Sequence, residues 1–109
     1  MSQVYWVYIT AADRREALEL AEKLVQNRLA ACVNVFREIE SVYRWQGRIE
    51  KDREVAMVAK TTAGRLGPLT DFVKKHHSYD CPCVVALPVE DGSRDFLDWV
   101  RQQVEGQTG

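Results

Sequence analysis

The stretch that most constrains this sequence runs from Cys32 to Lys60, where two long runs rich in Val, Ile, Tyr and Trp flank the pair Gln46-Gly47. A glycine at that place supplies the positive φ that a tight turn requires, so the stretch is predicted to be one β-hairpin. At about 3.3 Å per residue, the arm from Cys32 to Trp45 spans roughly 46 Å. A compact chain of this length is only about 34 Å across, so the hairpin is expected to project beyond its own domain.

A projecting two-stranded ribbon has unpaired edges and is marginal by itself in water. Its tip carries the apolar side chains of Val42, Tyr43, Trp45 and Ile49. Other copies of the chain are the simplest cover, which predicts a homo-oligomer. The alternative is a bulge that bends the hairpin back over its own core, because the apolar alternation breaks once, at Val35-Phe36.

The composition limits the classes of function. The chain of 109 residues predicts one domain, 1–109, and its 15 basic and 16 acidic residues give a net charge of −1, which carries no signature of nucleic-acid or anionic-membrane binding. No apolar run approaches the roughly 18 residues of a membrane span. The N-terminal residues predict a first strand and no signal peptide. Three cysteines are an odd number for a disulfide framework, so reduced thiols and a cytoplasmic location are expected.

The first half of the chain predicts a strand and a helix before the hairpin. Residues 3–10 are apolar and β-branched, as in a central strand. Asp13 and Glu16 have the spacing of a capping box that starts a helix. The apolar stripe of that helix is predicted to consist of Ala17, Leu18, Ala21, Leu24, Val25 and Leu29.

The second half predicts two more helices and one more strand. A helix is expected from about Pro68 to about His77, a strand over 84–89, and a third helix around 96–104, followed by a polar tail, EGQTG. The order β-α-β-β-α-β plus a terminal helix is the ferredoxin-like plan of the α+β class. It places two helices on one face of an antiparallel sheet and leaves the other face without a helix, so oligomerisation would complete its burial.

The densest cluster of metal-ligand types lies in residues 76–83, HHSYDCPC. Thiolate and imidazole together suit zinc or copper, and soft sulfur favours Cu(I). Cys81 and Cys83 point to the same side of an extended chain. Simpler interpretations stay open: His76 as a helix-end residue, and Cys32 and Cys83 as small buried side chains.

No arrangement of residues predicts an enzyme, because the sequence lacks a Gly-rich phosphate loop, a nucleophile elbow and a helical His-Glu zinc pair. RNA-recognition modules share the predicted element order, but the strand EVAMVAK has no aromatic residue on which a base could stack. Lys60, at the end of that strand, either extends to solvent or offers its ammonium to an anion. Trp45 is interpreted as an interface anchor.

Six segments of the chain carry a resemblance to a known family: RLAACVN (28–34), SVYRWQGRI (41–49), Glu54, Lys60-Thr61, HSYDCP (77–82) and ALPV (86–89). Together they resemble the CutA family, which is named for divalent-cation tolerance. The resemblance covers nearly everything from Val4 to Val104. It implies a ferredoxin-like fold in a tight homotrimer whose long hairpins pair between subunits, with similarity to PII-type signalling proteins and a role in copper or other divalent-metal homeostasis.

The resemblance also implies pockets between subunits. On this chain their residues would be Cys32, Trp45, Lys60, His77 and Tyr79, with Asp80 beside them. Where relatives commonly have His-Pro-Tyr-Glu, this chain has HSYD at 77–80, and where some have a cysteine at the end of the first strand it has Ile9. Cys81 and Cys83 replace residues that are usually not cysteine.

Three hypotheses follow. The first is a non-enzymatic, cytoplasmic trimer that binds copper or another divalent ion, with His77 as the principal ligand and Asp80, Cys81 or Cys32 assisting. The second is a PII-like sensor that binds a small anion between subunits through Lys60, Arg28 and the Tyr79 hydroxyl. The third is a stable structural trimer without a ligand.

Overall fold

A computed structural model describes residues 2–105 of the chain, so part of the predicted tail, residues 106–109, lies outside the described residues. The elements follow one another as β1 (Val4–Ala11), α1 (Arg14–Gln26), β2 (Cys32–Trp45), β3 (Arg48–Thr62), a short 3₁₀ helix η1 (Ala63–Arg65), α2 (Leu66–His76), β4 (Val84–Pro88) and α3 (Arg94–Glu105). None of the helices in this described part is long and apolar enough to cross a membrane.

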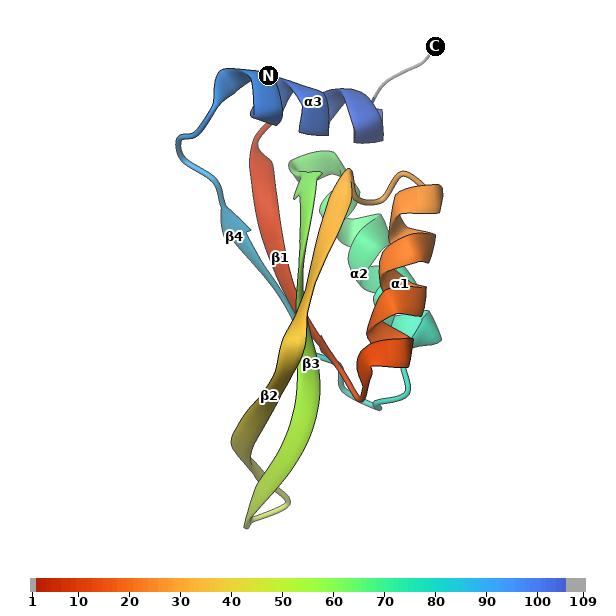
Figure 1. Cartoon of the computed structure of the whole chain (residues 1–109), viewed down its shortest axis with the longest axis vertical. Coiled ribbons are helices and arrows are strands. Elements are labelled where there is room, and N and C mark those ends of the chain that lie inside the picture. Colours follow the sequence, from red (N-terminus) through yellow and green to blue (C-terminus); the bar gives the residue numbers. More distant parts are fainter. Residues whose placement is uncertain (1, 106–109) are drawn as a thin grey trace.

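The strands form one antiparallel sheet in the order β2-β3-β1-β4. This confirms the predicted α+β class and its ferredoxin-like βαββαβ order. Helices α1 and α2 lie side by side on one face of the sheet, and α3 lies across the end of the sheet (Figure 1). Val7, Ile9 and Met57 project from the sheet into the core beneath α1 and α2, whereas Val100 and Val104 of α3 form a second cluster with Val4.

Helix α1 starts where the sequence predicts, because Asp13 Oδ1 accepts a hydrogen bond of 2.8 Å from the Glu16 N–H. The apolar stripe was partly wrong. Leu18 and Val25 are 46% and 41% exposed, and Leu20 is buried in their place. At about 100° per residue, Leu18 lies too far around the helix from Ala17 to face the same sheet.

Helix α2 begins at Leu66, two residues before the predicted start, with Pro68 inside its first turn. A proline fits there because the first N–H groups of a helix have no partner within the helix. Leu69 and Val73 are fully buried in the core beneath the helix.

The hairpin closes as predicted at Gln46-Gly47, whose φ angles of 50° and 79° are those of a type I′ turn. It projects past α1 and α2 (Figure 1), and the molecule extends 48 Å along its longest axis but only 26 and 23 Å along the others. The projection is therefore confirmed. A bulge does interrupt the pairing between Val35 and Glu38, but it leaves the hairpin extended.

The bulge also decides which side chains of the hairpin share a face. Cys32 pairs with Lys60 before it, whereas Ser41 pairs with Asp52 after it, so β2 advances one residue more than β3. The extra residue moves odd-numbered positions of β2 onto the face that even-numbered positions occupy before the bulge. Ser41, Tyr43 and Trp45 consequently lie on the face of the sheet away from α1 and α2.

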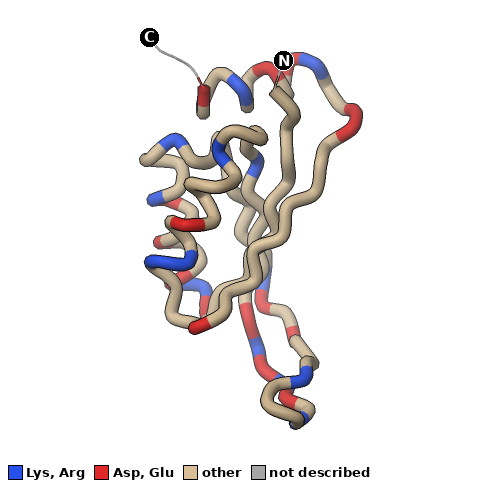
Figure 2. Tube along the Cα trace, turned by 180° about the vertical axis from the view of Figure 1, so that it is seen from behind, with Lys and Arg blue, Asp and Glu red and all other residues tan. Residues whose placement is uncertain are grey.

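That open face carries little charge near β1 and β4. Neither of these strands contains a charged residue, whereas acidic and basic positions are interspersed along the hairpin and the helices (Figure 2). Trp6, Val85 and Leu87 are 47%, 51% and 54% exposed there. Within residues 2–105 no helix covers this surface, as the sequence predicts.

Candidate functional site

A pocket of about 500 Å³ lies where the hairpin leaves the body of the molecule. One wall is the open face of the hairpin, and the other is the loop between α2 and β4. Its lining consists of Thr10, Ser41, Tyr43, Trp45, Asp52, Glu54, Ser78, Tyr79, Asp80, Cys81 and Cys83. The lining therefore includes carboxylates, thiols and aromatic rings, but no Lys or Arg.

Glu54 joins the two walls of the pocket. Its Oε1 accepts a hydrogen bond of 2.6 Å from Ser41 Oγ on β2, and its Oε2 accepts one of 2.8 Å from the Tyr79 hydroxyl on the loop. Burial and the neighbouring Glu54 carboxylate raise the pKa of Tyr79 above its ordinary value. The Tyr79 hydroxyl therefore keeps its proton and remains a hydrogen-bond donor at neutral pH.

A second tyrosine makes the same kind of contact nearer the tip. The Tyr43 hydroxyl donates to Asp52 Oδ2, and this hydrogen bond raises the pKa of Tyr43 to about 12. Burial, together with the charge of Glu54, raises the pKa of the Cys83 thiol. In the absence of a ligand Cys83 is therefore a thiol, and any species that binds its sulfur as thiolate must displace a proton.

His77 lies behind the pocket and holds the loop in place. Its side chain is fully buried. Nε2 lies 2.7 Å from the Thr10 carbonyl oxygen, and Nδ1 lies 3.0 Å from the Tyr79 backbone nitrogen. Since a carbonyl can only accept, Nε2 carries the proton and Nδ1 accepts from the Tyr79 N–H. The ring also packs on Tyr79, with centroids 4.7 Å apart. In this arrangement His77 has no lone pair directed into the pocket.

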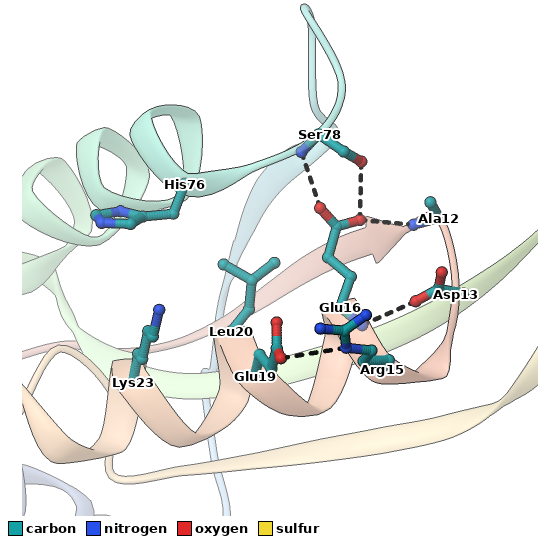
Figure 3. A pocket seen from close by; sticks show the side chains of 9 residues that line it. All are labelled: Ala12, Asp13, Arg15, Glu16, Glu19, Leu20, Lys23, His76 and Ser78. Atoms are coloured by element: carbon teal, nitrogen blue, oxygen red, sulfur yellow. Dashed lines mark hydrogen bonds and ion pairs between the residues drawn. The ribbon is translucent and has the colours of Figure 1, made fainter.

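Glu16 fixes the start of the same loop. Its Oε2 accepts a hydrogen bond of 2.8 Å from the Ser78 N–H, and its Oε1 accepts from Ser78 Oγ at 3.0 Å and from the Ala12 N–H at 2.9 Å (Figure 3). Burial tends to raise the pKa of Glu16, but the hydrogen bonds from Ala12 and Ser78 outweigh it, and the pKa lies below its ordinary value. The loop is thus held by α1 as well as by β1.

Figure 3 also shows a second, smaller pocket of about 380 Å³ between α1 and α2. Several of its side chains contact neighbours on their own helices. Arg15 Nε lies 3.4 Å from a Glu19 carboxylate oxygen, and His76 Nδ1 lies 3.0 Å from the Phe72 carbonyl oxygen while its ring stacks on that phenyl ring. This matches the simpler interpretation of His76 as a helix-end residue.

The pocket at the hairpin brings together five residues singled out from the sequence as site candidates: Trp45, Tyr79, Asp80, Cys81 and Cys83. The other candidates lie elsewhere in the same chain. Cys32 and Lys60 are paired neighbours farther up the sheet. Arg28 lies past the end of α1, where its guanidinium donates to the Gln103 carbonyl oxygen at 2.9 Å. Lys60, Arg28 and Tyr79 therefore do not form one anion site within a single chain.

Lys60 has its own surroundings on the open face. Its side chain is buried, its ammonium donates to Asn34 Oδ1, and it lies 5.8 Å from the centre of the Trp6 ring. Among residues 2–105 no carboxylate forms an ion pair with it.

The acidic residues of the pocket, Asp52 and Glu54, were missed as site residues, as was Ser41. A signal for them exists in the sequence. Once the turn at Gln46-Gly47 is placed, Asp52 and Glu54 fall on one face of the second arm, at a spacing of two. The same turn places Ser41 opposite Asp52, so Ser41, Tyr43 and Trp45 share that face.

The residue types in the pocket suit a metal ion, but their side chains are not positioned as a complete set of ligands. Carboxylate and thiolate are ligands for divalent and soft ions. Across the described residues 2–105, however, no three side chains of His, Cys, Asp or Glu are grouped closely enough to hold a metal ion. An ion in this pocket would need movement of the loop, water ligands, or donors from another subunit.

Comparison with known proteins gives the family. The model of the family described as CutA1 divalent ion tolerance protein matches residues 5–103. A divalent-cation tolerance protein CutA from Archaeoglobus fulgidus is 44% identical over 100 residues, which are 92% of this chain and 97% of that protein. The human protein CutA is 46% identical over 98 residues, or 90% of this chain and 55% of the human protein.

The chain thus spans about half the length of the human relative and of a chloroplastic protein CutA from Arabidopsis thaliana, of which it covers 52%. Solved structures agree with the sequence matches. The solved structure of the A. fulgidus protein, described as periplasmic, has a TM-score of 0.91 to this structure at 43% identity. The match covers 94% of this chain and 99% of the A. fulgidus chain. CutA1 from Oryza sativa has a TM-score of 0.93 at 36% identity, over 97% of both chains. The chain therefore belongs to the CutA1 divalent ion tolerance protein family.

Proposed function

We propose that the chain serves divalent-cation tolerance by binding a metal ion, without catalysing a reaction, in the pocket beside the hairpin. The observation that carries the proposal is the composition of the lining. Asp52, Glu54 and Asp80 contribute carboxylates, Cys81 and Cys83 contribute sulfur, and no Lys or Arg is among the lining residues. Such a lining attracts a cation and repels an anion, all the more so because the site is partly withdrawn from water.

Asp80, Cys81 and Cys83 are the proposed ligands, with Glu54 on the opposite wall. Paired thiolates favour Cu(I) among the biological metals. Because the pKa of Cys83 is raised, binding releases a proton and the apparent affinity is expected to fall as the pH falls. His77 acts mainly by holding the loop. It becomes a ligand only if the Tyr79 N–H leaves its Nδ1.

The assembly is proposed to be a homotrimer in the cytoplasm. The projecting hairpin and the exposed side chains of Trp6, Val85 and Leu87 on the open face support a self-association surface. All three cysteines are free thiols, which suits a reducing compartment. Light scattering on the purified protein tests the assembly, and a monomer mass at micromolar concentration would refute it.

Titration of Cu(I), in competition with a coloured chelator, tests the metal site. The double variant Cys81→Ser/Cys83→Ser is expected to lose at least tenfold in affinity. Cys32→Ser is the matched control, because it removes a thiol outside the pocket, and it is expected to bind as the wild type does. A double variant that binds as tightly as the wild type excludes this site. If only Cys32→Ser lost Cu(I) affinity, the metal site would lie at Cys32 on the open face instead.

A PII-like anion site is the second proposal, and Lys60 is the observation that favours it. A buried ammonium without a carboxylate partner among the described residues is costly, and an anion would relieve that cost. Arg28 would have to come from a different subunit. A thermal-shift screen of nucleotides and organic acids tests this proposal, with Lys60→Met as control. No stabilisation by any anion would refute it.

A further inference from the structure

The pocket beside the hairpin is far larger than a bare metal ion requires, and aromatic rings form much of its lining. Tyr43, Trp45 and Tyr79 all line its volume of about 500 Å³. Aromatic faces attract cations through the ring quadrupole, and carboxylates attract them by charge. The combination of both around one cavity is what recognition of an organic cation needs, since such a cation has an apolar body as well as a charge.

The hydrogen bonds in the pocket specify the ligand further. The Tyr79 and Tyr43 hydroxyls already donate to Glu54 and Asp52, so these groups are committed as donors. An ionised carboxylate can accept about four hydrogen bonds. Glu54 accepts two from the groups named above, and Asp52 accepts one. The remaining lone pairs accept from water in the free protein, and an ammonium or guanidinium group can take the place of that water.

We propose that this pocket binds a small organic cation, an ammonium or guanidinium group on a short apolar body. The charged end lies between Glu54 and Asp52, and the body packs on the rings of Trp45 and Tyr79. This is a ligand class beyond the metal ion of the proposed function. It shares the Glu54 and Asp52 wall with the proposed metal site, so the two ligands would compete there, but the sulfur atoms of Cys81 and Cys83 take no part in it.

Trp45 offers the proposed ligand an apolar contact in addition to the negative charge of the carboxylates. Its side chain is 49% exposed and has no role in the core, yet it lies on the same face of β2 as Ser41 and Tyr43. An exposed tryptophan beside acidic side chains is a favourable place for the apolar part of a cation.

Isothermal titration calorimetry of the full chain with 1,4-diaminobutane tests the proposal, and butane-1,4-diol serves as the uncharged ligand of matched shape. The diamine is expected to bind and the diol is not. Glu54→Gln and Asp52→Asn are each expected to weaken the diamine about tenfold, and Trp45→Leu about threefold to tenfold. Glu40→Gln is the matched control, because it removes the same charge from the opposite face of the hairpin.

Several outcomes would overturn the proposal. Equal binding of diamine and diol, or no diamine binding at all, would exclude a cation site. Equal weakening by Glu40→Gln and Glu54→Gln would reduce the effect to net charge. Asp52→Asn is a second variant in case Glu54→Gln fails to fold, which circular dichroism checks.

The same variants separate the organic-cation site from the metal site. Cys81→Ser/Cys83→Ser is expected to keep the diamine affinity while it loses Cu(I), and Trp45→Leu is expected to do the reverse. If copper never binds and the diamine does, the proposed function fails and this proposal stands.

Discussion

Replacement of Glu16 by glutamine is the sharpest test of how the loop between α2 and β4 is held in place. The wild-type carboxylate accepts hydrogen bonds from the Ser78 N–H, Ser78 Oγ and the Ala12 N–H. Glutamine keeps the shape but turns one oxygen into an NH₂ donor. Whichever way the amide is turned, that donor faces an N–H group of Ser78 or Ala12, and one backbone donor loses its partner.

The expected loss follows from the strength of these hydrogen bonds. A hydrogen bond to a charged group contributes about 1.5–3 kcal/mol. The Glu16 side chain is 17% exposed, so water can partly replace the lost acceptor, and about 1.5 kcal/mol is expected for Glu16→Gln. At the Ser78 amide this corresponds to roughly tenfold faster hydrogen exchange wherever exchange proceeds by local opening.

The pH dependence of stability gives a second signature. The pKa of Glu16 is lower in the folded chain than its ordinary value of 4.5, so the unfolded state binds more protons as the pH falls. The contribution of Glu16 is therefore complete above pH of about 4.5 and is lost as the pH falls through the folded-state pKa. Glu16→Gln is expected to remove this part of the acid destabilisation.

Denaturant unfolding at pH 7 and pH 4, at equal protein concentration, measures the difference. Glu19→Gln is the matched control on the same helix, because Glu19 is 58% exposed and pairs with Arg15 at 3.4 Å. Its expected effect is below about 0.5 kcal/mol. The reasoning fails if Glu16→Gln and Glu19→Gln have the same stability at pH 7, or if Ser78 exchange is unchanged.

Three further predictions concern backbone geometry, and all are read from denaturant midpoints or from the ligand titrations described above. Arg28 has a φ of 56° and donates to Gln103, so Arg28→Ala is expected to lose about 1 kcal/mol, whereas Arg28→Gly relieves the strained φ and loses less. Gly47→Ala, at a φ of 79°, is expected to cost about 1 kcal/mol. Deletion of Arg37 is expected to remove the bulge while the turn keeps Ser41 opposite Asp52 and Trp45 opposite Arg48, so diamine binding is expected to be retained in a folded protein.

Local features of this chain could be predicted from its sequence because each depends on residues close together. The turn at Gln46-Gly47 needs only a residue that tolerates positive φ, and the start of α1 needs only Asp13 beside the first N–H groups. The length of the hairpin follows from the two long runs of strand-forming residues that flank the turn. Its projection beyond the domain follows from that length.

The candidate site could be predicted only in part, because its contacts join distant segments. The His77 ring bonds to the Thr10 carbonyl 67 residues away, and Tyr79 bonds to Glu54 25 residues away. Residue types showed that HHSYDCPC contains side chains of the kinds that bind metals. They did not show that both ring nitrogens of His77 are used by the backbone, which makes it a residue that positions the loop.

The bulge at Val35/Glu38 is the point at which these local and distant features meet. The break in alternation was visible in the sequence, where it was weighed as a bend of the hairpin. In the structure its consequence is parity: even-numbered residues of β2 before the bulge and odd-numbered residues after it lie on the same open face. The turn at Gln46-Gly47 sets the register that places Ser41 opposite Asp52, and so puts Tyr43 and Trp45 on the face of Asp52 and Glu54. The hairpin wall of the pocket therefore follows from the turn, whereas the bulge brings Cys32 onto the same open face, beside Lys60, farther up the sheet.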